Sequence, residues 1–320
     1  LEPFVTAGRV YGLNEVIAAS DVLSDNVNPG NASAATFDGE IYAIPMELAG
    51  EVIYYNKAIF AENDLGIPET WDDLLRVVDT LRNAGVTPFS LANRDPWPGT
   101  IPYMAIFDRV NGPDAYRPAV FEREAEFDSE PYVRAAEYLV ELVDRGAYPE
   151  NFNSLDYAEG IALFDQGQAA MRYNGTWEMP GHIEALGDDL GVFTWPTMPE
   201  AASETGWLQL QNHAYAISSS APNKDAAAEL LEWIFSDERQ GVLAESGYVI
   251  AARNVPYDRD AMHPVASAVT DALSGTSNPI LIWDVLLGQN IGKELNLATQ
   301  AILGGTDIRR TLDSLNNIAK

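Results

Sequence analysis

The chain has 320 residues, 47% hydrophobic and 21% charged, and this length and composition indicate a folded globular protein of two lobes. Its 48 acidic and 19 basic residues give a net charge of -29, which argues against nucleic acid and anionic membrane surfaces as partners. The absence of cysteine excludes disulfides, thiolate catalysis and cysteine-based zinc sites.

The first predicted elements are two short strands and a helix. Asp38-Gly39-Glu40 predicts a turn, and the β-rich runs IYAIP and EVIYYN follow it with MELAG between them. The stretch PETWDDLLRVVDTLRNAG predicts a helix that Thr70 caps and Gly85 ends. Five apolar residues within it follow helical spacing: Trp71, Leu74, Leu75, Val78 and Leu81.

Strands and helices continue to alternate through the middle of the chain. VTPFSLANRDPWPG predicts a buried strand that runs into a loop rich in proline and glycine. Helices are expected at about 103–109, 131–145 and 156–166, followed by a strand at AAMRYN, a short helix at TWEMPGHIEALG and a strand at GVFTWPTMP. This alternation predicts an α/β protein with largely parallel sheets.

The C-terminal part is predicted to be mainly helical. The strand HAYAISSS precedes the helix PNKDAAAELLEWIFS, and the final helix DIRRTLDSLNNIAK carries its apolar residues on one stripe. No metal-ligand spacing joins His182, His213 and His263, and the chain has neither a G-x-G-x-x-G nor a Walker A motif. We therefore expect no metal and no cofactor.

A series of segments gives the chain a family likeness. In chain order they are LEPFVTAGRVYGL, DGEIYAIP, EVIYYNKAIF, IPETWDDLL, LFDQGQAAMRYNGTW, FTWPTMP, PNKDAAAELLEWIFSDE and SGYVIAARNV. In this order they resemble the bacterial extracellular solute-binding proteins of family 1, which serve carbohydrate ABC transporters and include maltodextrin-binding protein. The resemblance implies an α/β, type II periplasmic-binding-protein-like fold of two hinge-linked lobes, with sugar bound in the cleft.

The resemblance also implies a division of the chain. The N-terminal lobe would comprise 1–46 and 217–276, and the C-terminal lobe 47–216 and 277–320. Family members carry an opening region before the LEPF-like segment, so we expect the N-terminal lobe to lack its opening segment here and the natural protein to be longer. The family implies a non-enzymatic, extracellular or periplasmic monomer, held as a lipoprotein through that segment, with an ABC transporter permease as partner.

A sugar site needs flat aromatic rings for the apolar faces of the sugar and polar side chains for its hydroxyls. Trp71 and Trp233 lie on apolar helix faces and are predicted to be core, and Trp195, before Pro196, is predicted to be structural. The other tryptophans stand at loops or element ends beside glycine, proline or polar residues, where a ring can meet ligand. These candidates are Trp97, Trp177, Trp207 and Trp283.

The polar candidates lie in the same segments. They are Glu47, Glu51, Asp95, Asn174, Gln209 and Gln211. Glu47 and Glu51 flank the loop in which the family places a sugar-binding carboxylate or amide, and the resemblance does not choose between them. A solvated surface pair is the alternative for these two acids. Gln209 and Gln211 alternate along a strand, so their amides project from the same face.

The motif Asn174-Gly175-Thr176 has two interpretations. As N-x-T it matches a glycosylation acceptor, which is a pattern with many false positives. As a turn, Asn174 and Gly175 lead from strand to helix, Thr176 caps the helix, and Trp177 in its first turn faces the ligand. We favour the turn.

Two alternative functions remain open. A glycoside hydrolase needs two carboxylates about 5 to 10 Å apart, for which Glu47 or Glu51 could act with Asp95. The same fold could also bind a polyol, glycerol phosphate or a polyamine. A phosphate would require clustered basic residues, whereas those of this chain are dispersed.

Overall fold

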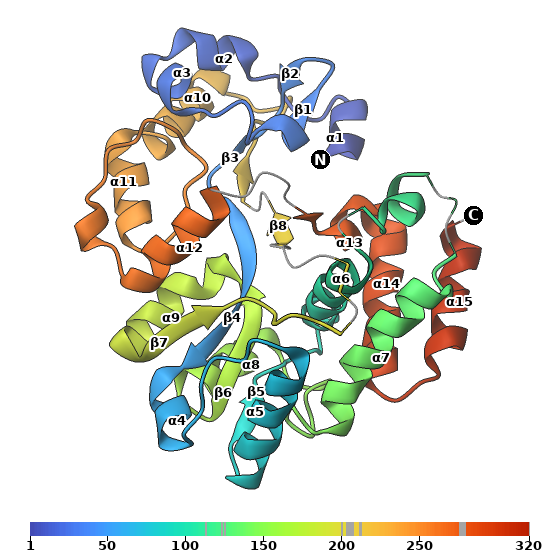
Figure 1. Ribbon diagram of the computed structural model, residues 1–320. Coiled ribbons are helices and arrows are strands. Elements are labelled where there is room, and N and C mark those ends of the chain that lie inside the picture. The colour runs from blue at the N-terminus through green and yellow to red at the C-terminus, as the bar shows by residue number, and fades with distance from the viewer. Residues whose placement is uncertain are drawn as a thin grey trace. The chain divides into compact units, whose positions relative to one another are not determined.

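The computed structural model describes residues 1–112, 114–122, 124, 126–199, 201–202, 208–210, 213–274 and 280–319. The chain divides into two compact units (Figure 1). Unit 1 comprises Leu1–Gly50 and Gln209–Gly275, and unit 2 comprises Glu51–Leu208 and Thr276–Lys320. The family resemblance implies divisions after residues 46, 216 and 276.

Unit 1 combines small helices with two strand pairs. Its helices are α1 (Glu2–Thr6), α2 (Asn14–Ala19), α3 (Asp21–Asn26), α10 (Lys224–Ile234), α11 (Asp237–Glu245) and α12 (Pro264–Ser274). Strands β1 (Thr36–Phe37) and β2 (Glu40–Ile41) pair antiparallel, as do β3 (Ile44–Pro45) and β9 (Ala214–Tyr215). The predicted turn lies between β1 and β2, where Asp38 and Gly39 both have positive φ, as a tight hairpin requires.

The core of unit 1 does not include Trp233, which the sequence analysis assigned to it. Leu231 and Phe235 of the α10 segment pack against Leu23 of α3, whereas Trp233 is 56% exposed. Residues two positions apart on a helix point in different directions, so Trp233 cannot share the face of Leu231. Its ring instead lies 4.8 Å below the guanidinium carbon of Arg239.

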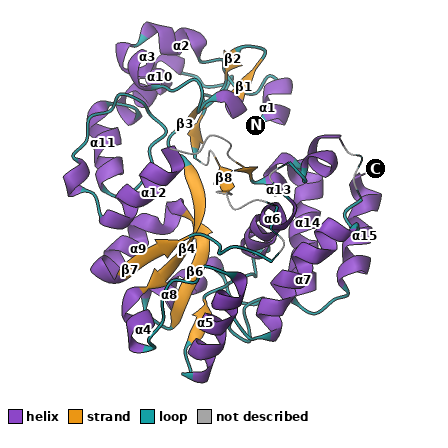
Figure 2. Cartoon of the chain, viewed as in Figure 1, coloured by secondary structure: helices purple, strands orange, loops and turns teal. Residues whose placement is uncertain are grey.

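Unit 2 is built around strand β4 (Ala49–Asn56), which begins in unit 1. The strand order is β10–β8–β4–β6–β5, and β7 also pairs with β4. The other strands are β5 (Thr87–Phe89), β6 (Ala169–Gly175), β7 (Leu190–Phe193), β10 (Ile280–Leu281) and β8 (Leu208–Leu210), of which β8 has Leu208 in unit 2 and its other residues in unit 1. Figure 2 shows β4, β6 and β5 side by side, with helices packed around them.

The direction of these strands differs from the expectation. β4 runs antiparallel to β6, β7 and β8, and β5 runs parallel to β6. The α/β class is confirmed, but the prediction of largely parallel sheets is wrong for this sheet. Alternation of helices and strands does not by itself fix direction, because strands that pair in a sheet need not follow one another in the chain, as β4 and β6 show.

The helices of unit 2 are α4 (Lys57–Glu62), α5 (Trp71–Asn83), α6 (Trp97–Asn111), α7 (Glu130–Asp144), α8 (Tyr157–Asp165), α9 (Met179–Leu186), α13 (Trp283–Leu286), α14 (Gly288–Leu303) and α15 (Ile308–Ala319). Among them, α5, α7 and α8 begin within one residue of the predicted start. Thr70 and Asp73 form a capping box at the start of α5, and the five predicted apolar positions of α5 are buried. Helix α6 packs against α7 and α14.

Helix α6 begins earlier than predicted, inside the segment expected to be a loop. Trp97 is its first residue and Pro98 lies in its first turn. Proline is accepted there because the first backbone N–H groups of a helix have no partner within the helix. Trp97 is therefore held at a rigid helix start rather than in a loop.

Candidate functional site

The segment from β6 to α9 places Trp177. β6 ends at Gly175, a 3-10 turn covers Thr176–Glu178, and α9 follows. Gly175 is extended (φ -77°), so the backbone itself does not require glycine. A Cβ atom there would lie 2.0 Å from Cζ3 of Trp177, which means that the indole ring rests directly on the Gly175 backbone. The turn is also held by Tyr54, whose hydroxyl donates to the Gly175 carbonyl at 2.9 Å.

Three half-buried aromatic side chains from three helix starts meet at this point. We call Trp97, Tyr157 and Trp177 the aromatic cluster. The ring centroids of Trp97 and Tyr157 are 5.0 Å apart, and those of Trp97 and Trp177 are 6.1 Å apart. The indole N–H of Trp177 donates to the Tyr157 hydroxyl at 2.7 Å. Each of the three residues is partly exposed, so the cluster can offer aromatic surface to a ligand.

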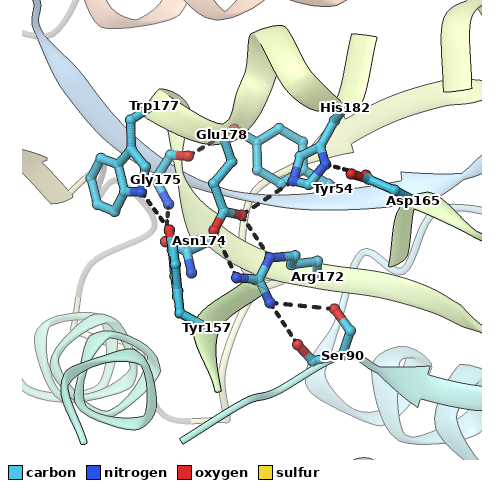
Figure 3. A network of polar contacts seen from close by, with 10 residues as sticks. All are labelled: Tyr54, Ser90, Tyr157, Asp165, Arg172, Asn174, Gly175, Trp177, Glu178 and His182. Carbon is cyan, nitrogen blue, oxygen red and sulfur yellow. Dashed lines mark hydrogen bonds and ion pairs between the residues drawn. The ribbon is translucent and has the colours of Figure 1, made fainter. Parts of the chain in front are cut away.

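A buried ion network lies beside Tyr157 and Trp177 (Figure 3). Arg172 donates from Nε and Nη2 to the two carboxylate oxygens of Glu178 at 2.6 and 2.7 Å, and from Nη1 to the Ser90 carbonyl at 2.7 Å. His182 continues the network, with Nε2 3.2 Å from Glu178 and Nδ1 2.5 Å from Asp165. The side chains of Arg172 and Glu178 are each 2% exposed, so the two charges depend on each other for solvation.

The network sets the protonation of its members. Burial alone would raise the pKa of Glu178, but Arg172 and His182 hold it at about 2, so the carboxylate stays ionised. Burial alone would lower the pKa of His182, but hydrogen bonds with Asp165 and Glu178 bring it above the ordinary value. Both ring nitrogens of His182 face carboxylates, which is the arrangement that an imidazolium ion satisfies.

Asn174 and Glu51 are buried with unpartnered polar atoms. Asn174 is 1% exposed, and its Nδ2 has no hydrogen-bond partner among the described residues. Glu51 is 3% exposed, and neither of its carboxylate oxygens has a hydrogen-bond partner among the residues that the structure describes. Burial, together with the nearby charge of Asp284, raises the pKa of Glu51 well above its usual range. Buried polar groups rarely stay unpaired, so each is a candidate for contact with a ligand.

The register separates these two residues. Val52 lies opposite Asn174, and Glu51 lies opposite Gly175. Because successive side chains of a strand point to opposite faces, Asn174 shares a face with Arg172, whereas Glu51 leaves the sheet on the other face. The expected alternative of a solvated surface pair is wrong for the two acids, since Glu47 and Glu51 are both buried.

Glu47 has a different environment from Glu51. It lies in unit 1, where its carboxylate contacts His213 Nδ1 and its backbone bridges Ile250. Asp95 is exposed and lies just before α6. Gln209 belongs to β8, opposite Gly50. Trp207 and Gln211 lie outside the described residues.

Trp283 does not join the aromatic cluster. It is 0% exposed, and its ring packs among Tyr103, Phe107, Tyr116 and Tyr132, with centroid distances of 5.9, 5.4, 6.2 and 6.1 Å. The prediction that it offers an open ring face is wrong, because these aromatic side chains cover it. Trp195, predicted to be structural, is likewise buried.

Sequence reasoning missed the residues that hold Trp177: Tyr157, Arg172, Glu178 and His182. Two signals were present. Glu178 and His182 are four residues apart, which is the spacing of neighbours on one helix face. Asp156 and Glu159 form a capping box that fixes the start of α8 next to Tyr157. The pairing of Arg172 with Glu178 across the turn had no comparable local signal.

The described residues contain no group of three or more histidine, aspartate or glutamate side chains arranged to hold a metal ion. Within the same residues, no helix is both long and apolar enough to span a membrane.

Comparison with known proteins places these features in context. Residues 1–241 match the family model described as bacterial extracellular solute-binding protein. The chain is 27% identical over 249 residues, 77% of its length, to an uncharacterized ABC transporter extracellular-binding protein of Pyrococcus horikoshii, of which it covers 54%. It is 28% identical over 166 residues, 49% of its length, to a multiple sugar-binding protein of Streptococcus mutans, of which it covers 39%.

The fold has close structural counterparts. A solved structure described as a chitin oligosaccharide binding protein matches with a TM-score of 0.90 and 24% identity, covering 99% of this chain and 80% of that one. Of the two relatives from Pyrococcus horikoshii and Streptococcus mutans, by contrast, the chain spans only about half of the length or less.

Proposed function

We propose, from the premise that this chain belongs to the family of bacterial extracellular solute-binding proteins, that it is the substrate-binding component of an ABC importer. Its ligand is a carbohydrate, an oligosaccharide in particular, which it delivers to a membrane permease. The observation that carries the proposal is the half-buried aromatic cluster of Trp97, Tyr157 and Trp177. The sugar-binding description of the Streptococcus mutans relative supports the ligand class.

The energetics of sugar binding favour a site with several rings. Micromolar affinity corresponds to about -8 kcal/mol, and association with ordering costs roughly 4 to 15 kcal/mol. One indole face buried against a sugar contributes about 2 to 4 kcal/mol, so a single ring is too little. Two indoles 6.1 Å apart offer adjacent contact surfaces. Asn174, whose Nδ2 is unpartnered, is the polar group we assign to a sugar hydroxyl.

Further residues stay predictions from the sequence as ligand contacts. Glu51, Asp95, Gln209, Gln211 and Trp207 stay candidates for ligand contact, and Glu51 is the strongest of them because it is buried without a partner. Glu47 is a weaker candidate because His213 already occupies its carboxylate. The lipoprotein anchor and the monomeric state also stay predictions from the resemblance.

Calorimetric titration of single-site variants tests the proposal. The unchanged protein is titrated with malto-, xylo- and chito-oligosaccharides, followed by Trp97→Ala and Trp177→Ala. We expect each substitution to weaken binding about 30- to 1,000-fold, which corresponds to the loss of one stacked ring at about 2 to 4 kcal/mol. Trp233→Ala is the matched control, because this tryptophan is exposed in unit 1 and lies outside the cluster. Absence of binding to every glycan, or equal losses in all three variants, would contradict the proposal.

The hydrolase alternative has its own test. Catalysis needs two carboxylates at one reacting bond, whereas the relatives described above are named as binding proteins. We expect the unchanged protein to leave the same oligosaccharides intact over hours, as followed by chromatography. Turnover that disappears in Glu51→Gln would replace the binding function with an enzymatic one.

A further inference from the structure

We propose that Tyr157 is a positioning residue, which fixes the indole of Trp177 in the orientation that a carbohydrate requires, while the buried Arg172–Glu178 pair anchors both residues. The effect on ligand affinity rests on the proposed function. The positioning itself is a property of the unliganded protein.

The backbone at Trp177 is fixed from the side of Glu178. Trp177 and Glu178 are neighbours in the 3-10 turn that follows β6. The Glu178 carboxylate takes both prongs of the Arg172 guanidinium, and Arg172 is a central residue of β6 that also binds the Ser90 carbonyl. Planar, two-point pairing of this kind fixes orientation as well as distance. The turn is thereby tied to the sheet through Glu178.

The indole itself is fixed from the other end. Its only polar atom, Nε1, donates to the Tyr157 hydroxyl at 2.7 Å. The Tyr157 ring lies 5.4 Å from the guanidinium carbon of Arg172. The Tyr157 hydroxyl therefore accepts from Trp177, while the ring of the same residue lies against the ion pair. One side chain links the exposed ring to the buried ion pair that holds its backbone.

This arrangement prepares Trp177 for ligand before a ligand arrives. A half-exposed indole without a partner samples several rotamers, and binding must then immobilise it. Here the Tyr157 bond, together with the contact between the ring and Gly175, fixes the rotamer in advance. Tyr157 need not contact the sugar to raise the affinity.

Tyr157→Phe is the direct test, because phenylalanine keeps the ring contacts with Trp97 and loses the hydroxyl. In the unliganded protein labelled with 15N-tryptophan, the indole N–H resonance of Trp177 is identified by its disappearance in Trp177→Phe. We expect this resonance to shift in Tyr157→Phe and its hydrogen exchange to accelerate. Calorimetry with the malto-, xylo- and chito-oligosaccharides is expected to show about 3- to 10-fold weaker binding.

Tyr55→Phe is the matched control. Tyr55 is a half-buried tyrosine of β4 outside the aromatic cluster, and its ring packs against Phe60 and Phe193. We expect it to leave both the Trp177 resonance and the affinity unchanged. The proposal is overturned if Tyr157→Phe leaves the Trp177 resonance in place, or if it weakens binding no more than Tyr55→Phe. A purely structural residue behaves differently: Tyr157→Phe would then lose affinity and thermal midpoint together while the Trp177 resonance stays in place. That result also overturns the proposal.

The two proposals fail in different ways. If the unchanged protein binds no oligosaccharide, the proposed function fails. The positioning by Tyr157 is then decided by the indole resonance alone, which must move in Tyr157→Phe and stay in Tyr55→Phe.

Discussion

At the scale of single residues, the site depends on side-chain neighbours more than on backbone strain. Gly175 adopts an extended conformation that any residue can adopt, yet a Cβ atom there would overlap the Trp177 ring. Glycine is required at position 175 because the ring of Trp177, two residues later, occupies the space that a Cβ atom would need. A pattern search finds the N-G-T motif but not this reason for it.

Gly175→Ala is predicted to displace the Trp177 ring and weaken carbohydrate binding about tenfold, because the preformed contact surface is lost. Gly181→Ala is the control, since a Cβ at this exposed position of α9 meets no atom within 4 Å. Calorimetric titration of both variants with the tightest-binding oligosaccharide checks the prediction. Equal affinities would show that the ring has room to move without loss of binding.

The burial of Glu51 makes the stability of the protein depend on pH. Burial raises its pKa, with Asp284 adding to the effect, so the folded state prefers the neutral acid. A raised folded-state pKa contributes stability that is present below the unfolded value of 4.5 and is lost as pH rises through the folded value. We predict that Glu51→Gln, a neutral isostere, stabilises the protein above this window by about 1 to 3 kcal/mol and has no effect at low pH.

Urea unfolding from pH 4 to pH 9 measures this difference. Glu62→Gln, at an exposed position of α4, is the control and is expected to leave the pH dependence unchanged. A Glu51→Gln protein that is less stable than the parent at high pH would mean that the ionised carboxylate has a stabilising partner.

At the scale of elements, the segment β6–turn–α9 acts as one unit because charged side chains cross it. His182 on α9 faces Asp165 of α8 and Glu178 of the turn, and the rings of Tyr54 and Phe164 pack against it at 4.7 and 4.9 Å. The net charge of Asp165, Glu178, Arg172 and protonated His182 is zero. Deprotonation of His182 would leave an unbalanced negative charge in a buried place.

The predicted consequence is a loss of stability on the alkaline side. The two carboxylates outweigh burial and raise the pKa of His182, so its contribution is fully present below its ordinary value of 6.5 and is lost as pH rises through the folded value. Glu51→Gln serves as the background because Glu51 would otherwise titrate in the same direction. Urea unfolding from pH 6 to pH 9 should show a steeper decline for Glu51→Gln than for Glu51→Gln/His182→Gln. Parallel curves would contradict the prediction.

Elements with their own local signals were predictable from the sequence. Thr70, Asp73 and Gly85 mark the ends of α5, and its apolar spacing marks the buried face. The environments of single tryptophans were not predictable in this way. Trp233 and Trp283 exchanged their expected roles, because exposure depends on which segments far along the chain cover a ring. Tyr103, Phe107 and Tyr132 cover Trp283 from α6 and α7, and no spacing within its own segment reveals this.

At the scale of the whole molecule, the net charge of -29 dominates the electrostatics. Such a charge destabilises the compact state through self-repulsion, and salt screens it, with a Debye length of about 8 Å at 0.15 M. A neutral sugar held by rings and amide groups is indifferent to this field. A polyamine is attracted by it.

We therefore predict that salt affects the stability but not the oligosaccharide affinity. The thermal midpoint should rise between about 0.01 and 0.5 M NaCl, while oligosaccharide affinity stays within about twofold over the same range. Scanning calorimetry and titration calorimetry measure the two quantities. A ligand whose affinity falls tenfold or more over this range would be cationic. The hypothesis of a polyamine ligand would then replace that of a carbohydrate ligand.

Strand β4 has a practical consequence for anyone who wishes to study the two halves separately. Each compact unit is assembled from two distant stretches of polypeptide, and Ala49 to Asn56 form one uninterrupted strand that begins in one unit and ends in the other. No single truncation of the chain therefore yields one intact unit. A protease that cleaves within this strand would damage both halves at once, so fragments made by truncation would report on broken pieces rather than on either building block.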